Sequence, residues 1–214
     1  MIISGGRNYI FVHIPKTGGT ALALALEARA KADDIMLGDT PKAVKRRKRV
    51  KDVQAAGRLW KHSTLADIVG LIPQEQIKNS FTFTLVRNPW DRLVSYYHWL
   101  REQSFDHPAV TLAQAQPFSG FLNHQQTRAA MIAMPYARYM QDAQGVEHCS
   151  AYIRIENFTE DVAPLEAHLG FSLQLDRVNA SIRDADYRRY YSGGDSQLVA
   201  EICAQDIARF GYSY

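Results

Sequence analysis

The sequence is poor in cysteine, in long apolar runs and in net charge, and each shortage excludes a class of protein. Cys149 and Cys203 are the only cysteines in 214 residues, too few for a disulfide framework or a zinc site. No stretch approaches the roughly 20 apolar residues of a membrane span, and no basic region precedes the first apolar run as in a signal peptide. The formal net charge of +3 is too small to require a nucleic-acid partner. We therefore expect a soluble, cytoplasmic protein with no membrane span and no bound nucleic acid.

An apolar run followed by a glycine-containing loop is the most informative feature that is present. Residues 9–14 predict a buried strand, residues 15–20 (Pro-Lys-Thr-Gly-Gly-Thr) a tight loop, and residues 18–30 a helix rich in Ala and Leu. Free N–H groups and the helix dipole favour an anion at such a helix start. The glycines allow close backbone approach, the lysine adds a charge, and the threonines add hydroxyl donors. We expect a phosphate site made of Pro15, Lys16, Thr17, Gly18, Gly19 and Thr20.

A second strand, loop and helix carry further anion-binding groups. Residues 81–86 predict a strand, and the loop that begins at Arg87 leads into a helix with Pro89 at its start. Five residues at helical spacing predict its buried stripe: Trp90, Leu93, Val94, Tyr97 and Leu100. Ser95 lies off that stripe. Because ligands bind at the carboxyl ends of parallel strands, Arg87 and Ser95 could hold a second phosphate.

The rest of the chain completes an α/β pattern. Residues 151–158 predict a third strand, and neither a repeat nor a linker interrupts the sequence, so we expect a single domain over residues 1–214. The expected fold is a P-loop-like parallel sheet flanked by helices. Residues 103–150 lack a sustained period and predict short helices near 118–124 and 127–133. They form either a substrate-facing wall on the acceptor side or a peripheral helical layer.

A run of basic residues occupies positions 42–51, where seven of ten side chains are Lys or Arg. Such a run is typical of a solvated, mobile surface segment, and a docking surface for an anionic substrate is the alternative. Residues 65–72 predict a short helix that ends near Pro73, with His62 just before it.

The two loops together resemble those of sulfotransferases that use 3′-phosphoadenosine 5′-phosphosulfate (PAPS). The loop at 15–20 is similar to the 5′-phosphosulfate loop of that family, and Arg87 with Ser95 is similar to its 3′-phosphate motif. Shorter pieces stand in the order found in the branch with heparan 2-O-, chondroitin 4-O- and bacterial members; they are residues 61–64, 86–89, 155–158 and 206–212. The first strand lies close to residue 1, which favours a bacterial protein.

The resemblance implies transfer of a sulfuryl group from PAPS to an acceptor hydroxyl by in-line displacement. Lys16 is placed to stabilise the leaving phosphate, and His62 is the expected general base, with Glu156 as a competing carboxylate. Arg183 and Arg188 either fold over the 3′-phosphate or lie on the surface. A sulfuryl group carries less charge than a phosphoryl group, so no metal is expected.

Two other functions remain open from the sequence. A small-molecule kinase of the P-loop class would need Mg²⁺ and a lysine after the glycines, whereas Lys16 precedes them. A nucleotide-binding module without catalysis would keep the loops and not need His62. The acceptor is expected to be a carbohydrate or another small polar molecule.

Overall fold

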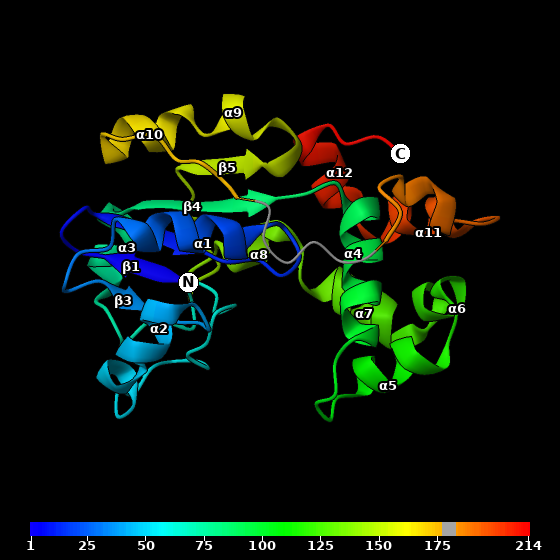
Figure 1. Cartoon of the computed structure of the whole chain (residues 1–214), viewed down its shortest axis with the longest axis horizontal. Coiled ribbons are helices and arrows are strands. Elements are labelled where there is room, and N and C mark those ends of the chain that lie inside the picture. Colours follow the sequence, from blue (N-terminus) through cyan, green and yellow to red (C-terminus); the bar gives the residue numbers. More distant parts are fainter. Residues whose placement is uncertain (177–182) are drawn as a thin grey trace. The chain divides into compact units, whose positions relative to one another are not determined.

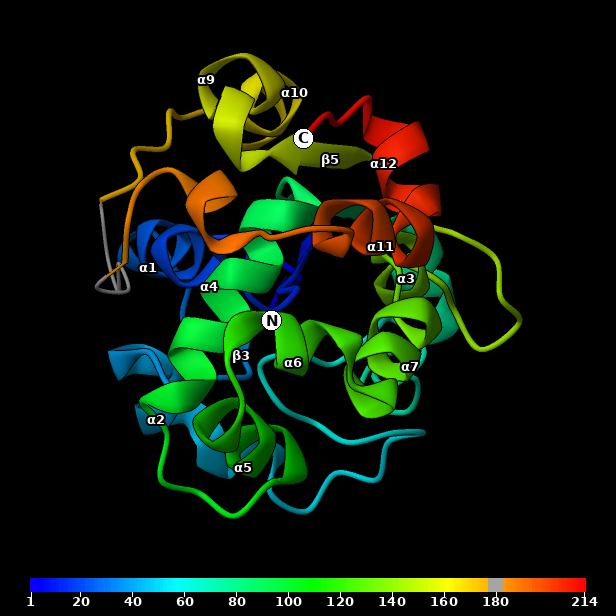
Figure 2. The same ribbon diagram turned by 90° about the vertical axis from the view of Figure 1, so that its right-hand side faces the viewer.

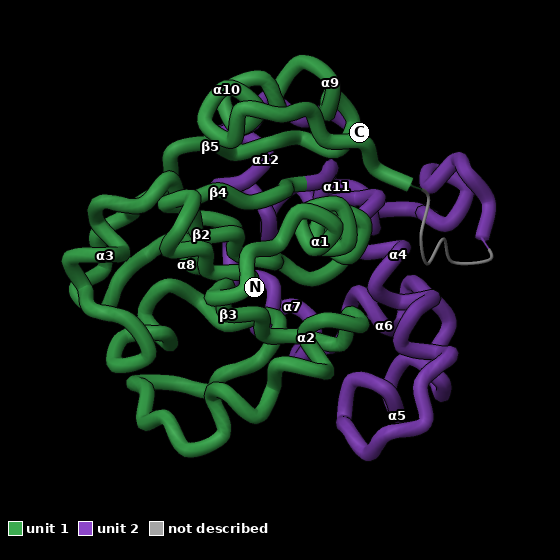
Figure 3. Tube along the Cα trace, turned by 60° about the vertical axis from the view of Figure 1, so that its left-hand side comes forward, with its two compact units in different colours: residues 1–86, 136–179 green, residues 87–135, 180–214 purple. Residues whose placement is uncertain are grey.

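The computed structural model describes residues 1–176 and 183–214, and it divides into two compact units. Unit 1 comprises residues 1–86 and 136–179, and unit 2 comprises residues 87–135 and 180–214 (Figure 3). Each unit has its own hydrophobic core. The single domain expected over residues 1–214 stays a prediction.

Unit 1 is built on a five-stranded sheet in the order β3-β1-β2-β4-β5 (Figure 1). Strands β2 (Tyr9–Val12), β4 (Phe81–Val86) and β5 (Ala151–Arg154) form its parallel part, in which β4 pairs with β2 on one side and with β5 on the other, and Phe11 lies opposite Phe83. This confirms the predicted α/β class with a P-loop-like parallel centre.

The sheet is mixed rather than wholly parallel. Strand β1 (Ile2–Ser4) pairs antiparallel with both β2 and β3 (Ile35–Met36). The sequence pattern did not indicate strand β1. Three consecutive buried residues are too short a run to show a strand period, because a strand pattern needs at least four positions.

Helices pack on the sheet of unit 1 through one shared core. Helix α1 (Gly19–Ala28) contributes Leu22 and Leu26, and α10 (Ala163–Leu169) contributes Leu165, all at most 1% exposed. The remaining helical elements of unit 1 are α2 (Pro41–Arg46), η1 (Arg47–Val50), α3 (Gln74–Asn79), α8 (Tyr136–Tyr139), η2 (Ile155–Asn157) and α9 (Phe158–Asp161).

Two local predictions in unit 1 need correction, and the basic run has a defined structure. The basic run folds as α2 and η1, since Pro41 starts the helix and Ala43 is buried in the core. Residues 65–72 form turns instead of a helix, and helix α3 begins only after Pro73. The third strand ends at Arg154, because the chain turns into η2 immediately afterwards.

The described part of unit 2 consists of helices: α4 (Pro89–Arg101), α5 (Pro108–Ala115), α6 (Phe118–Asn123), α7 (Gln125–Ala133), η3 (Tyr187–Tyr190), α11 (Asp195–Ile202) and α12 (Ala204–Phe210). The side chain of Asn88 accepts a hydrogen bond from the Trp90 N–H at 3.0 Å, which caps α4, and Pro89 is its first residue. Helices α5, α6 and α11 pack against α4 (Figure 2).

The predicted stripe of α4 is confirmed, since all five residues are at most 4% exposed. The short helices expected near 118–124 and 127–133 are confirmed as α6 and α7. The C-terminal helices α11 and α12 meet at Cys203. Gly211 ends α12 with a φ of 65°.

Candidate functional site

The loop between β2 and α1 has an unusual backbone. Gly18 caps α1 in the left-handed region with a φ of 87°, and Lys16 lies in the same region with a φ of 66°. Glycine adopts this conformation without cost, whereas a lysine there is strained and needs the surrounding structure to hold it. A strained residue directly before a helix N-terminus is typical of a ligand-binding turn.

The two glycines of the loop lie close to other side chains of unit 1, and Gly18 also has the positive φ that favours glycine. A Cβ on Gly18 would lie 2.1 Å from Cδ1 of Ile155, and a Cβ on Gly19 would lie 2.2 Å from the ring of His13. The ring of His13 therefore packs directly on the first residue of α1. His13 is 6% exposed, and burial holds its pKa well below the usual value.

The other loop residues lie at different depths. The hydroxyl of Thr17 donates to the carbonyl oxygen of Ile14 at 2.9 Å, and the residue is fully buried. That hydroxyl hydrogen bond stabilises the loop, and the contact of Thr17 with a phosphate stays a prediction. Pro15, Lys16 and Thr20 are half-buried.

The structure brings His62 next to this loop through His13. The two rings are 4.7 Å apart between centroids, and Nδ1 of His62 lies 2.7 Å from the carbonyl oxygen of His13. A carbonyl oxygen only accepts hydrogen bonds, so Nδ1 carries the proton and Nε2 keeps its lone pair. Burial lowers the pKa of His62 to about 4, although the bond to His13 opposes this shift. The imidazole is therefore neutral at pH 7.

A cleft of about 1050 Å³ in unit 1 is lined in part by Lys61, the residue before His62, while His62 itself does not belong to the described lining. Trp60 lines it, is 39% exposed, and has its ring centroid 4.9 Å from that of His62. The basic side chains that line the cleft are Arg47, Lys48, Lys51 and Lys61, and the lining contains no acidic residue. Part of the basic run thus lines a cavity, and its alternative role as a docking surface for an anionic substrate stays a prediction. Glu156, the competing base, is an exposed residue of η2.

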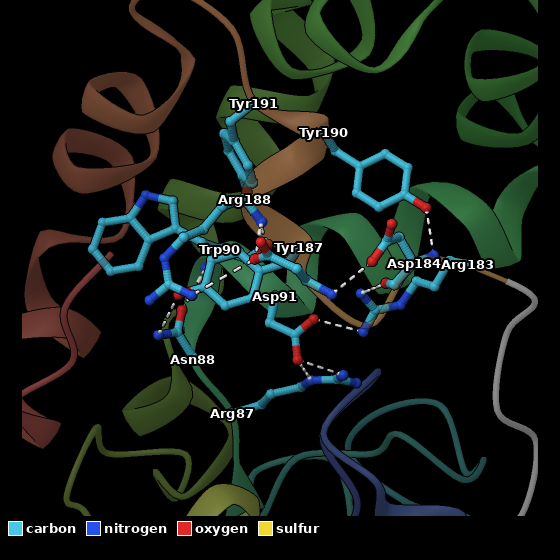
Figure 4. A network of polar contacts seen from close by, with 11 residues as sticks. Arg87, Asn88, Trp90, Asp91, Arg183, Asp184, Tyr187, Arg188, Tyr190 and Tyr191 are labelled. Atoms are coloured by element: carbon cyan, nitrogen blue, oxygen red, sulfur yellow. Dashed lines mark hydrogen bonds and ion pairs between the residues drawn. The ribbon is translucent and has the colours of Figure 1, made fainter.

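In unit 2 the structure brings two of the predicted arginines together on one carboxylate (Figure 4). Nε and Nη2 of Arg87 donate to Oδ2 of Asp91 at 2.8 and 2.6 Å. Nη2 of Arg183 donates to Oδ1 of the same residue at 2.5 Å. Asp91 was not predicted as a site residue, although its position four residues after Arg87 on a helix is a recognisable signal for an ion pair.

Ser95 and Arg188 have different surroundings. Ser95 lies one turn after Asp91 on α4 and is 5% exposed, deeper than its place off the predicted stripe suggested. The guanidinium of Arg188 lies over the rings of Tyr187 and Tyr214, 4.8 and 5.7 Å from their centroids, and 3.7 Å from Asp186. Arg188 is thus stacked on tyrosines, whereas Arg183 joins Arg87.

Residues 1–176 and 183–214 contain neither a candidate metal centre nor a candidate membrane span. No group of three or more His, Cys, Asp or Glu side chains in these ranges could hold a metal ion. Within the same ranges, no helix is both long and apolar enough to cross a membrane.

Comparisons with known proteins identify the family of this chain. Among solved structures, the chain is similar to mouse sulfotransferase SULT7A1 complexed with PAP, at 16% identity and a TM-score of 0.48, over 96% of this chain and 85% of that one. A likeness at this level does not extend to ligands or site residues. No curated protein matches the sequence. The profile of the sulfotransferase family matches residues 1–209. The chain therefore belongs to the sulfotransferase family, and the enzyme class predicted from its two loops is confirmed.

Proposed function

We propose that this enzyme transfers the sulfuryl group of PAPS to a hydroxyl of a carbohydrate or another small polar acceptor. The observation that carries the proposal is the position of His62, whose protonated Nδ1 is bonded to His13 while the ring of His13 packs on the glycine turn. A candidate base is thereby tied to a candidate phosphate loop within one unit.

The donor is held by two groups of residues. Backbone N–H groups of residues 17–20 and the side chain of Lys16 bind the 5′-phosphate. Arg87, Ser95 and Arg183 bind the 3′-phosphate, since arginine presents a planar fork of donors that suits phosphate oxygens. Arg188 is the weaker candidate, because its guanidinium is stacked on tyrosine rings.

The reaction forms one S–O bond and breaks another. The acceptor oxygen attacks sulfur, and the bond from sulfur to the bridging oxygen of the 5′-phosphate opens, so negative charge develops on that oxygen. Lys16 neutralises this charge, and Nε2 of His62 takes the proton of the acceptor hydroxyl. The products are adenosine 3′,5′-bisphosphate and a sulfate ester.

The acceptor enters through the cleft beside His62. Its basic lining and the exposed ring of Trp60 favour an acceptor with negative charge and a flat apolar face. A cytoplasmic location and a bacterial origin stay predictions.

Calorimetry tests the donor assignment. Adenosine 3′,5′-bisphosphate should bind with a micromolar Kd, and Arg87→Ala should weaken it at least tenfold. Preference for Mg²⁺·ATP would instead indicate a kinase. Full turnover by His62→Ala would exclude His62 as the base, and absence of any turnover in the unaltered protein with PAPS would favour a binding module.

A further inference from the structure

We propose that Asp91 is a positioning residue that arranges Arg87 and Arg183 as a two-arginine clamp for the 3′-phosphate of the donor. The inference rests on the proposed function, because it requires a donor with a phosphate at that position. All three residues belong to unit 2 and are drawn in Figure 4.

The carboxylate of Asp91 uses each of its oxygens for a different arginine. Oδ2 accepts two N–H groups of Arg87, and Oδ1 accepts one from Arg183, at distances between 2.5 and 2.8 Å. Charge-assisted hydrogen bonds of this length fix the orientation of a planar guanidinium as well as its position. Asp91 therefore joins the start of α4 to a segment 92 residues later in the chain.

The charges of the three groups suit a phosphate. The side chains of Arg87 and Asp91 are 18% exposed, and that of Arg183 is 10% exposed, so solvent screens them only in part. Two guanidinium groups at such a site repel each other unless an anion lies between them. Asp91 supplies that anion and leaves the three groups with one surplus positive charge.

Other contacts hold the later segment near α4 without Asp91. The hydroxyl of Tyr190 accepts a hydrogen bond from the backbone N–H of Asp184 at 2.7 Å, and the ring of Tyr190 lies 4.8 Å from that of His98 on α4. Burial and then the charge of Arg183 lower the pKa of His98, which agrees with Arg183 facing this side of α4.

The test compares two nucleotides that differ only in the 3′-phosphate. The ratio of the Kd of 5′-AMP to that of adenosine 3′,5′-bisphosphate measures what this phosphate contributes to binding. We expect Asp91→Asn to lower the ratio about tenfold, as for the loss of one well-placed charged contact, and to leave the Kd of 5′-AMP unchanged. Glu102→Gln is the matched control, since it removes the same charge from an exposed position after α4 and should keep the ratio of the unaltered protein.

The opposite results overturn the inference. A higher ratio in Asp91→Asn would show that Asp91 competes with the phosphate, and an unchanged ratio, or an equal loss of both affinities, would show a structural role only. If Asp91→Asn does not fold, Asp91→Glu is the second variant, because it keeps the charge on a longer side chain. It should lower the ratio of the two Kd values about threefold. An unchanged ratio in Asp91→Glu overturns the proposal. If the unaltered protein does not distinguish the two nucleotides, the proposed function itself fails.

Discussion

His62 is the residue whose chemistry is most fully determined by its surroundings. Burial keeps its imidazole neutral, and the carbonyl of His13 leaves Nε2 without a proton. The sequence suggested His62 only through its resemblance to a family, because a lone histidine between a lysine and a serine carries no signal for burial or for a tautomer.

The pH dependence of turnover follows from the lowered pKa of His62. With a pKa of about 4, the base stays unprotonated, so kcat/KM should be nearly constant between pH 7.5 and 5.5. A base with the ordinary pKa near 6.5 would lose about nine-tenths of its activity over the same range. A rate profile with saturating PAPS separates the two cases, and a steep fall near pH 6.5 would contradict the assignment.

Substitution of the same residue should separate chemistry from binding. His62→Ala should lower kcat by about 10²- to 10⁴-fold, the usual contribution of a general base, with little change in the affinity for adenosine 3′,5′-bisphosphate. Single-turnover rates and calorimetry measure the two quantities. Glu156→Gln is the control, and a larger loss there would transfer the role to the carboxylate.

At the scale of elements, the glycine turn depends on a contact that the sequence does not show. Gly19→Ala should raise helix propensity by about 1 kcal/mol but force a Cβ into the ring of His13. Because overpacking costs about 1–3 kcal/mol, we expect lower stability and weaker nucleotide binding. Melting curves measure the stability of Gly19→Ala. Gly194→Ala is the control, because its added Cβ meets nothing within 4 Å. Equal stability of the two variants would mean that the ring moves aside easily.

The 3-10 helix η1, which carries Arg47, Lys48 and Arg49, gives a second prediction. Arg47→Gln with Lys48→Gln should weaken binding of a glucuronate-containing hexasaccharide about tenfold and leave a neutral N-acetylglucosamine hexamer unaffected, because both side chains line the cleft. The matched control is Lys45→Gln with Lys78→Gln, two exposed residues that do not line it. Equal effects of the two pairs would show that only the overall charge matters.

The elements that the sequence predicted well are those with a long, regular pattern. Strand β4 and the stripe of α4 match their predictions, since six apolar or β-branched residues and a helical repeat are strong local signals. Strand β1, the turns at 65–72 and the pairing of Asp91 with Arg183 depend on tertiary contacts. Local patterns do not contain such contacts, so these features could not be predicted.

At the scale of the whole molecule, acid should reduce stability at a pH above the range in which the aspartates with lowered pKa values titrate. His13 and His62 have lowered pKa values in the folded protein, so the unfolded chain binds more protons below pH 6.5, and stability falls as pH decreases from about 6.5 toward 4. The aspartates with lowered pKa values act only near and below their ordinary value of 3.8. Melting temperatures should therefore drop over this window, and His62→Gln should make the drop smaller. A melting temperature that is constant from pH 6.5 to 4.5 would contradict this account.

The acceptor for the hydrogen bond of His62 belongs to the main chain of a residue next to the central strand. No substitution of a neighbouring side chain removes that carbonyl, so the choice of tautomer is built into the backbone path. Mutations around the cleft can change how strongly His62 attracts a proton, while the nitrogen that receives it stays the same.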